Sequence, residues 1–417
     1  MSSVLTSETP LEFSRAHDLE AITLISVAHA CSHFYHLVIP SLFPWLMPAF
    51  GLSYTQAGAL VTSFFVASAL GQASSGFFVD KFGPKSGLYW GLCLLISSGI
   101  VVGFSQNYGM LFFGSVLAGL GNSVFHPVDY SLMNYNISTS RLGHAFAWHG
   151  VTGNIGWALT PVFIVSLATI FNWRVAAFSA SSVAILVFIM VVVRRATFSN
   201  DQTKKKAETS VAGDGENEIF AFLKEPSVWL CFLFFFFTSG AFGVLQSYSP
   251  IIFQKAYGLD LTFASAALTA YLLGAGAGGL SGGFCTNQIR FSSDAIVGMS
   301  LSFAALMAIL LASGLFTGWI AIPLMAMMGF GTGVAAPSRD ILIRKATINR
   351  LGFGAFGRVY GFVYCGMDAG QSLAPLVFGP LLDAGHFSLA LIGIAVLQTL
   401  GIFTALRVGG DVRKHAS

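Results

Sequence analysis

Long apolar runs, separated by short polar segments, extend over most of the chain. Each run has about 20 residues or more, which is the length that a helix needs to cross the hydrocarbon core of a bilayer. The runs lack the alternation of a membrane β-strand, so helices are the expected spanning structure. We predict twelve transmembrane helices, at residues 20–48, 56–79, 87–105, 109–135, 144–169, 174–193, 226–253, 263–284, 294–314, 317–342, 355–380 and 387–407.

The composition supports this pattern and narrows the function. Hydrophobic residues make up 55% of the chain and charged residues only 9%, whereas about a quarter of a soluble domain is charged. A soluble fold of this composition would expose large apolar patches. The predicted fold class is therefore an all-α membrane protein. We expect neither a soluble enzyme nor a nucleic-acid-binding protein, and we predict no cofactor.

Lys and Arg residues are distributed unevenly between the two sides of the predicted membrane. If the N-terminus is cytoplasmic, only Arg174 and Lys255 of the 21 Lys and Arg residues lie on the opposite side. Loops rich in Lys and Arg remain in the cytoplasm, so both termini are predicted to be cytoplasmic, in a plasma membrane such as the bacterial inner membrane. The polar stretch 196–218 is typical of a flexible linker. It divides the chain into an N-terminal six-helix bundle (1–193), a cytoplasmic linker (194–224) and a C-terminal six-helix bundle (225–417).

The two halves of the chain resemble each other, as expected of transporters built from repeats. Three short segments recur in the same order with slowly growing offsets. The matching pairs are 51–58 with 258–265, 119–127 with 329–337, and 156–161 with 370–375. Two pseudo-symmetric bundles around a central cavity are the arrangement that this repeat predicts.

The loop after the second predicted helix reads Gly76-Phe-Phe-Val-Asp80-Lys81-Phe-Gly83-Pro-Lys85. It resembles the signature Gly-x-x-x-Asp-Arg/Lys-x-Gly-x-Arg/Lys of the major facilitator superfamily, and it lies where that family carries it. More narrowly, Phe125-His126-Pro127 is similar to the fosmidomycin-resistance branch. The resemblance implies alternating access, in which two six-helix bundles rock about a central site. It also implies that helices 3, 6, 9 and 12 face lipid.

The first predicted helix carries three histidines, His29, His33 and His36, within an arc of about 60°. Ionisable groups at membrane depth are costly and are usually functional. We interpret this stripe as a solute- or proton-binding surface, because histidine titrates near neutral pH. Hydrogen bonding between helices is the alternative. A metal site is a third interpretation, although His29 and His36 would lie about 10 Å apart along one helix.

The fourth predicted helix carries Asn122, His126 and Asp129 on one face. Pro127 is expected to kink this helix and to leave the carbonyl of Ser123 without a partner. Asn122 and His126 are predicted to contact the solute, with His126 facing the histidines of the first helix. The alternative is a helix that serves only in packing.

The eleventh predicted helix carries Tyr364 and Asp368 on one face. Burial disfavours a charged carboxylate, so Asp368 could take up and release a proton. We predict Asp368 as the proton-coupling group and Asp129 as a second one, with a purely structural Asp368 as the alternative. Tyr364 and Tyr248, on the seventh predicted helix, complete the predicted solute contacts.

Charged residues near the cytoplasmic helix ends are candidates for a gate: Asp80, Lys81, Arg339 and Arg358. Asp129 and Arg339 occupy equivalent positions in the two repeats, so we predict that they pair when the cytoplasmic side closes. Asp80 could pair with Arg358 or with a helix N-terminus. Arg339 could instead be an ordinary positive-inside residue.

These features together favour secondary active transport of a small polar or anionic organic solute. The chain has no phosphate-binding loop for ATP, so an ion gradient, most simply of protons, would drive it. Efflux by antiport and uptake by symport both remain open. A non-transporting membrane sensor and an intramembrane histidine-dependent enzyme are the alternatives. The predicted partners are the solute, the proton and the lipid bilayer, and we expect a monomer.

Overall fold

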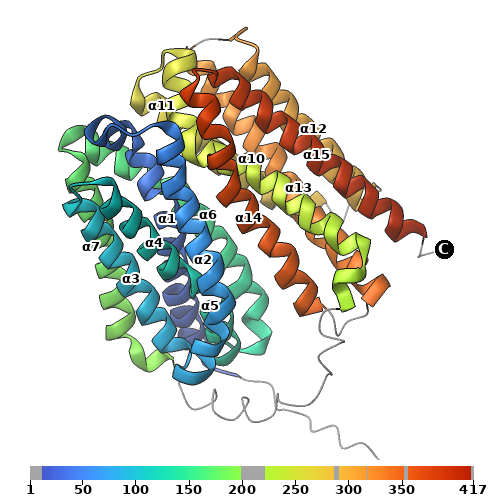
Figure 1. Ribbon diagram of the computed structural model, residues 1–417. Helices are drawn as coiled ribbons and strands as arrows, with labels where there is room; N and C mark the ends of the chain where they lie inside the picture. The colour runs from blue at the N-terminus through green and yellow to red at the C-terminus, as the bar shows by residue number, and fades with distance from the viewer. Residues whose placement is uncertain (1–11, 199–220, 286–290, 317, 352–355, 415–417) are drawn as a thin grey trace, which may run out of the picture.

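The computed structural model describes residues 12–198, 221–285, 291–316, 318–351 and 356–414, and these are folded almost entirely into helices. Figure 1 shows two bundles side by side. The first contains α1 (Arg15–Phe50), α2 (Tyr54–Phe82), α3 (Pro84–Phe104), α4 (Tyr108–Ser123), α5 (Phe125–Asn136), α6 (Leu142–Ile170) and α7 (Trp173–Val193). The second contains α10 (Pro226–Tyr257), α11 (Leu261–Cys285), α12 (Ser293–Ala312), α13 (Ala321–Leu351), α14 (Phe356–Asp383) and α15 (Phe387–Lys414).

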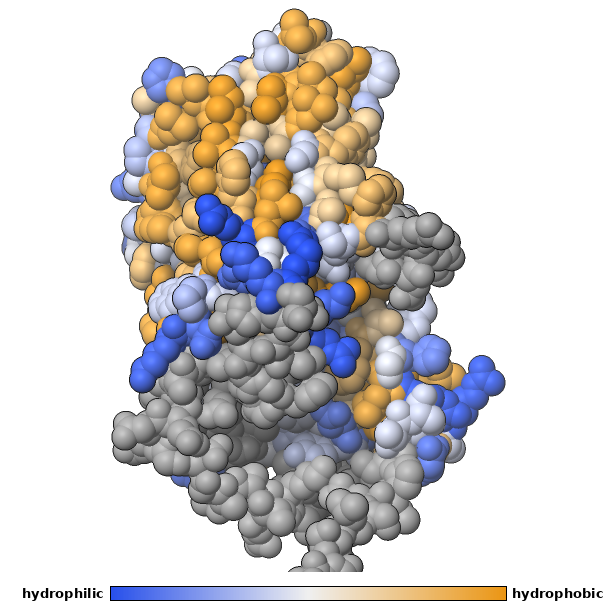
Figure 2. Space-filling view, turned by 90° about the vertical axis from the view of Figure 1, so that its right-hand side faces the viewer, coloured by the Kyte–Doolittle hydropathy of each residue, from blue (hydrophilic) through white to orange (hydrophobic). Residues whose placement is uncertain are grey.

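The helices agree with the predicted spans. Within the described residues, 10 helical segments are long and apolar enough to cross a membrane, and α4 and α5 count together as one of them. Helices α2 and α14, with 29 and 28 residues, complete the set of twelve. On the face shown in Figure 2, apolar side chains cover the upper part and hydrophilic side chains gather below them. The predicted linker falls largely on residues 199–220, outside the described residues, so the domain boundaries stay a prediction.

Large apolar side chains are exposed on the four helices that were predicted to face lipid. They include Phe104 on α3, Leu186 on α7, Leu306 on α12 and Phe403 on α15. In water each would be unfavourable, whereas in hydrocarbon such a surface needs no polar cover.

The fourth span is interrupted where a kink was predicted. Helix α4 ends at Ser123 and α5 begins at Phe125, with Val124 between them. Pro127 therefore lies in the first turn of α5, where a missing N–H removes no helical hydrogen bond. The next amide with a donor, that of Val128, bonds to the carbonyl of Val124 at 3.0 Å. This break allows α5 to turn His126 and Asp129 independently of α4.

Glycines let α11 and α13 pack with their backbones in contact. A Cβ atom built on Gly274 or Gly278 of α11 would overlap the carbonyl oxygen of Ala326 or Phe330 on α13. Gly333 on α13 meets the backbone of α11 in the same way. Small residues at such spacing allow close helix approach in membranes. Gly274 and Gly278 thus form a packing surface on α11.

We expect Gly278→Ala to destabilise the protein, whereas Gly276→Ala on the same helix should not. The new Cβ at Gly278 would overlap backbone that cannot move without separating the helices, at a cost of about 1–3 kcal/mol. Nothing lies within 4 Å of a Cβ at Gly276, and alanine favours the helix there. Thermal unfolding in detergent would compare the two variants. Equal melting temperatures would contradict this account of the α11–α13 contact.

Candidate functional site

The bundles are joined at one end by the carboxylate of Asp383, the last residue of α14. Its Oδ1 accepts a hydrogen bond from the Tyr54 N–H at 2.6 Å, and its Oδ2 accepts from the Thr55 N–H at 3.1 Å and from the Thr55 hydroxyl at 2.6 Å. Tyr54 and Thr55 begin α2, where unpaired N–H groups and the helix dipole attract negative charge. A carboxylate of the C-terminal bundle thus caps a helix of the N-terminal bundle.

Further contacts between the bundles lie at the same end. The Thr62 hydroxyl on α2 donates to the carbonyl of Ser372 on α14 at 2.6 Å. The hydroxyl of Tyr248 lies 2.9 Å from the carbonyls of both Tyr54 and Pro375. Tyr248, a predicted solute contact, is therefore fully buried in this closed end. Figure 1 shows the bundles diverging from here toward the end where α1 begins.

The predicted ion pair between Asp129 and Arg339 is not formed in this state. Arg339 Nε instead donates to Asp340 Oδ1 at 2.9 Å, and its guanidinium lies 4.8 Å from the ring centroid of Phe235. An Asp129–Arg339 pair that holds the diverging end closed would be broken in a state in which the bundles are separated at that end. The gate therefore stays a prediction.

The other predicted gate residues are only partly described. Lys81 is exposed, and its Nζ lies 5.3 Å from the ring centroid of Phe82. The side chains of Asp80 and Arg358 lie outside the described part of the structure.

Histidines from three helices meet inside the N-terminal bundle. The histidine cluster comprises His29 and His33 on α1, His126 on α5 and His149 on α6. The rings of His29 and His149 stack with centroids 3.5 Å apart, and those of His29 and His33 lie 4.3 Å apart. His126 lies 5.3 Å from His29 and 6.2 Å from His149. The predicted approach of His126 to the first helix is thus present, and His149 is an additional member.

Asp129 is completely buried beside this cluster. Its Oδ2 lies 3.1 Å from His149 Nε2 and 3.2 Å from His29 Nδ1. Its Oδ1 has no hydrogen-bond partner among the described residues. A buried carboxylate without compensating donors is strongly unfavourable. Of the two imidazoles, His149 makes a hydrogen bond with Asp129, and His29 lies close to it without one.

His36 and Asn122 belong to a second polar network beside the cluster, with the rings of His36 and His33 5.1 Å apart. His36 Nε2 lies 2.9 Å from Asn122 Oδ1, and the Ser32 hydroxyl donates to the same oxygen. The Asn122 amide donates to Ser68 at 2.8 Å. The side chain of Asn122 is therefore engaged on both sides, and it joins α1, α2 and α4. These two predicted solute contacts hold helices together in this state.

A row of aromatic rings connects the histidine cluster to the C-terminal bundle. His33 stacks on Trp157 of α6 with centroids 4.3 Å apart, and Trp157 lies 5.2 Å from Phe242 of α10. Phe242 in turn stacks on Tyr271 of α11 at 6.0 Å. The last two rings line a cavity, so the cluster and the cavity lie at the two ends of one row.

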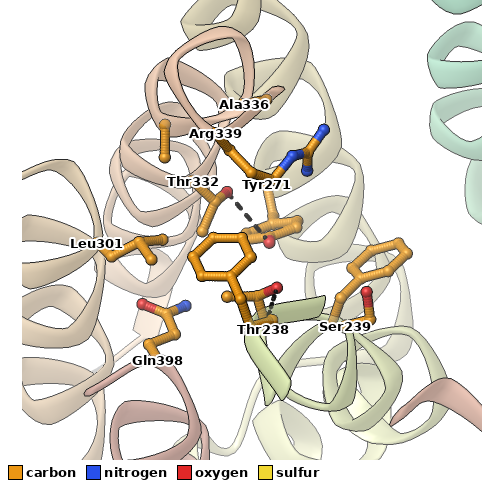
Figure 3. A pocket seen from close by; sticks show the side chains of 11 residues that line it. Thr238, Ser239, Tyr271, Leu301, Thr332, Ala336, Arg339 and Gln398 are labelled. Atoms are coloured by element: carbon orange, nitrogen blue, oxygen red, sulfur yellow. Dashed lines mark hydrogen bonds between the residues drawn. The ribbon is translucent and has the colours of Figure 1, made fainter. Parts of the chain in front are cut away.

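The cavity has a volume of about 140 Å³ and is lined by residues of five helices of the C-terminal bundle. Figure 3 shows Arg339 above it, Tyr271 and Thr332 hydrogen-bonded to each other, and Gln398 with Thr238 below. The Thr332 and Tyr271 hydroxyl oxygens are 3.2 Å apart. Gln398 is buried, and its Oε1 has no hydrogen-bond partner in the described part of the chain. A guanidinium, hydroxyls and an amide therefore surround a space larger than a single water requires.

Asp368 lies on α14 one turn before Ser372, on the same helix face. Ser372 is where α2 contacts α14, so Asp368 is placed at the point where the bundles begin to separate. Its side chain is half-buried, and no hydrogen bond or ion pair connects it to another described residue. The remaining predicted solute contact, Tyr364, packs against the ring of Phe235 with centroids 4.9 Å apart.

Two residues of this architecture were not predicted from the sequence. His149 satisfies the rule applied to the other histidines, because it is an ionisable residue well inside the fifth predicted span, whereas His144 lies at its end. Asp383 ends a span and so resembles an ordinary loop carboxylate. Its partner on another helix is visible only in the folded chain.

Comparisons with known proteins agree with this architecture. The model of the Major Facilitator Superfamily matches residues 25–375. Fosmidomycin resistance protein of Escherichia coli (strain K12) is 25% identical over 381 residues, covering 91% of this chain and 90% of that protein. Membrane sensor protein UhpC of the same organism is 24% identical over 354 residues, covering 81% and 80%.

Solved structures show the same fold. A bacterial homologue of the human lysosomal transporter Spinster, in an inward-facing and occupied conformation, has a TM-score of 0.77 at 12% identity and covers 97% of this chain and 99% of its own. A structure of a proton dependent oligopeptide transporter has a TM-score of 0.70 at 15% identity, with coverage of 95% and 100%. The predicted fold of twelve helices in two six-helix bundles is confirmed. This chain belongs to the Major Facilitator Superfamily, a family of transporters, and it is a multi-pass membrane protein and not an enzyme.

Proposed function

We propose that this chain is a proton-coupled secondary transporter of a small anionic organic solute in the bacterial inner membrane. The cavity that contains Arg339 carries the proposal. Both termini would be cytoplasmic, so the Asp383 contacts would close the outer side and the structure would face the cytoplasm. The chain would work as a monomer.

The chemistry of the cavity favours an anionic group. Among the described residues that line it, Arg339 is the one charged residue, and the hydroxyls of Tyr271 and Thr332 and the amide of Gln398 can each donate a hydrogen bond. Asp340 compensates part of the Arg339 charge, which favours a monoanion over a multiply charged solute. Phe234 and Phe242 form apolar walls that suit a short carbon skeleton.

Asp368 is the group that we assign to proton coupling. It lies on the C-terminal bundle at the edge of the contact with α2, so rocking of the bundles would change its exposure to water. A carboxyl group that loses water in one state and gains it in the other binds its proton differently in the two states. That difference is what couples a proton gradient to the conformational cycle.

Flux into proteoliposomes that contain the purified protein would test the proposal. Small carboxylates and phosphonates would be offered under an imposed pH gradient, and an internal pH dye would report proton movement. We expect one of these anions to move together with protons, and the sign of the effective gradient would distinguish antiport from symport. Transport of neutral sugars or cations with no anion flux would contradict the proposed solute class.

We expect Arg339→Gln to lower the apparent affinity for the transported anion about 10- to 100-fold. A hydrogen bond to a charged group contributes about 1.5–3 kcal/mol, and the glutamine would supply none of that charge. Arg344→Gln is the matched control, because Arg344 is exposed on the same helix. Michaelis constants from the flux assay would compare the two variants. An unchanged Michaelis constant in Arg339→Gln would show that the solute does not bind in this cavity.

A solute sensor is the second candidate, because a relative that matches 81% of the chain is a membrane sensor protein. A sensor would bind the anion with the same residues but would not move it. Thermal stabilisation by an anion, combined with no flux under any gradient, would select this alternative.

A further inference from the structure

We propose that His29, His126 and His149 form a binding site for a divalent transition metal ion, with Asp129 as its charge partner. Each of the three histidines offers one ring nitrogen, and these nitrogens all lie within 4.8 Å of one another. A zinc ion holds imidazole nitrogens at about 2.0–2.1 Å, so small rotations of the rings would bring all three to one ion. The site lies in the N-terminal bundle and is separate from the proposed solute cavity.

The ligands come from three helices, which resolves the difficulty of a metal site on α1 alone. His29 and His36 are two turns apart on one helix and cannot bind the same ion. In the fold, α1 contributes His29, α5 contributes His126 and α6 contributes His149. The break between α4 and α5 helps to bring His126 into reach, because it sets the direction of α5 independently.

Asp129 occupies the place that an outer carboxylate takes in many metal sites. A histidine ligand usually donates its second ring N–H to a carboxylate, which fixes the ring and its tautomer. His149 Nε2 makes a hydrogen bond with Asp129 Oδ2 at 3.1 Å, which leaves Nδ1 of His149 for a metal. His29 Nδ1 lies 3.2 Å from the same oxygen but makes no hydrogen bond there. Asp129 Oδ1 is buried without a hydrogen-bond partner among the described residues, and native structures rarely leave such an atom unpaired.

The rings of His29 and His149 stack with centroids 3.5 Å apart, so the two helices bring both imidazoles to one place. Neutral imidazole is the form that binds metals, and a divalent cation would balance the buried carboxylate.

Gly153 keeps the space around these rings open. A Cβ at Gly153 would lie 2.8 Å from His33 Nδ1 and 3.0 Å from His29 Nε2. Those distances are shorter than van der Waals contact, so a larger residue would push the imidazoles away. The backbone of α6 thus approaches the histidine cluster at a position without a side chain.

Zinc binding to the purified, metal-stripped protein tests this proposal, with an affinity tag that contains no histidine. Calorimetry and elemental analysis would measure affinity and stoichiometry, and the visible absorption of Co²⁺ would report nitrogen coordination. We expect about one Zn²⁺ per chain, which Co²⁺ replaces with the spectrum of a four-coordinate site. His149→Ala and His126→Ala should each lower the affinity at least 100-fold, and Asp129→Asn about 10- to 100-fold.

His144→Ala is the matched control, because His144 is exposed on the same helix as His149. It should bind Zn²⁺ as the wild type does. If His149→Ala does not fold, His126→Gln measures the same loss at a half-exposed ligand on another helix. The proposal is overturned if the wild type binds no zinc, or if binding is equal in wild type and both ligand variants. The readout is metal binding, so it does not depend on the identity of the transported solute.

Discussion

Replacing Asp368 with asparagine is expected to reduce strongly the solute flux that is driven by a pH gradient. Asparagine has the shape of a protonated aspartic acid, but it cannot release a proton. If Asp368 carries the coupled proton, the variant is held in one protonation state, and a proton gradient can no longer bias its cycle. We expect net gradient-driven flux to fall by at least tenfold, while exchange of labelled for unlabelled solute continues.

Comparing gradient-driven flux with exchange distinguishes a variant that has lost proton coupling from one that does not fold. Exchange requires binding and rocking but no net proton movement, so a misfolded variant loses both modes together. Asp368→Glu keeps an ionisable carboxyl group and should retain part of the gradient-driven flux. Asp260→Asn, which makes the same chemical change at an exposed capping position, should behave as the wild type does. Full gradient-driven flux in Asp368→Asn would assign coupling to another group.

The sequence predicted the helices well because the bilayer itself imposes their length and composition. The spans, the division into two bundles and the interruption near Pro127 are all local properties of the chain. The shared face of Asn122, His126 and Asp129 likewise follows from helix periodicity. Such features need no knowledge of which helices are neighbours.

Contacts between helices were harder to predict. His149 joins His29 because α6 packs closely on α1, where a Cβ on Gly156 would overlap the carbonyl oxygen of Ala30. The repeat equivalence of Asp129 and Arg339 indicated a pair, yet each has a different partner here. Pairing across the bundles depends on the conformational state, and a sequence encodes all states of the cycle at once.

Which conformational state the protein adopts depends on contacts between the bundles, such as the contact of Asp383 with the start of α2. A carboxylate on α14 and the first amides of α2 are 329 residues apart in the chain. No helix periodicity or charge pattern indicates that they meet. Because the contact closes one end and has no counterpart at the diverging end among the residues that the structure describes, it is a natural position at which to alter the balance between states.

We expect Asp383→Ala to weaken the closed end and to shift the population toward the state that is open there. Three hydrogen bonds to a carboxylate are lost, but the site is exposed, so solvent screening reduces their net contribution to about 1–2 kcal/mol. That free energy corresponds to a five- to thirtyfold change in the ratio of the two states.

Spin labels at Gln106 and Leu315, two exposed loop positions on different bundles at this end, would measure the shift in a variant whose native cysteines are replaced. In Asp383→Ala, the distance distribution should gain a component at longer distance. In Asp383→Asn, which keeps an acceptor oxygen without the charge, this component should be less populated. Asp260→Ala is the matched control. Its carboxylate caps α11 at the same end by accepting from Thr262 and Phe263, but it does so within one bundle. If the cap between bundles holds the end closed, only its loss changes the distance. Equal distributions in all three variants would mean that helix packing alone keeps this end shut.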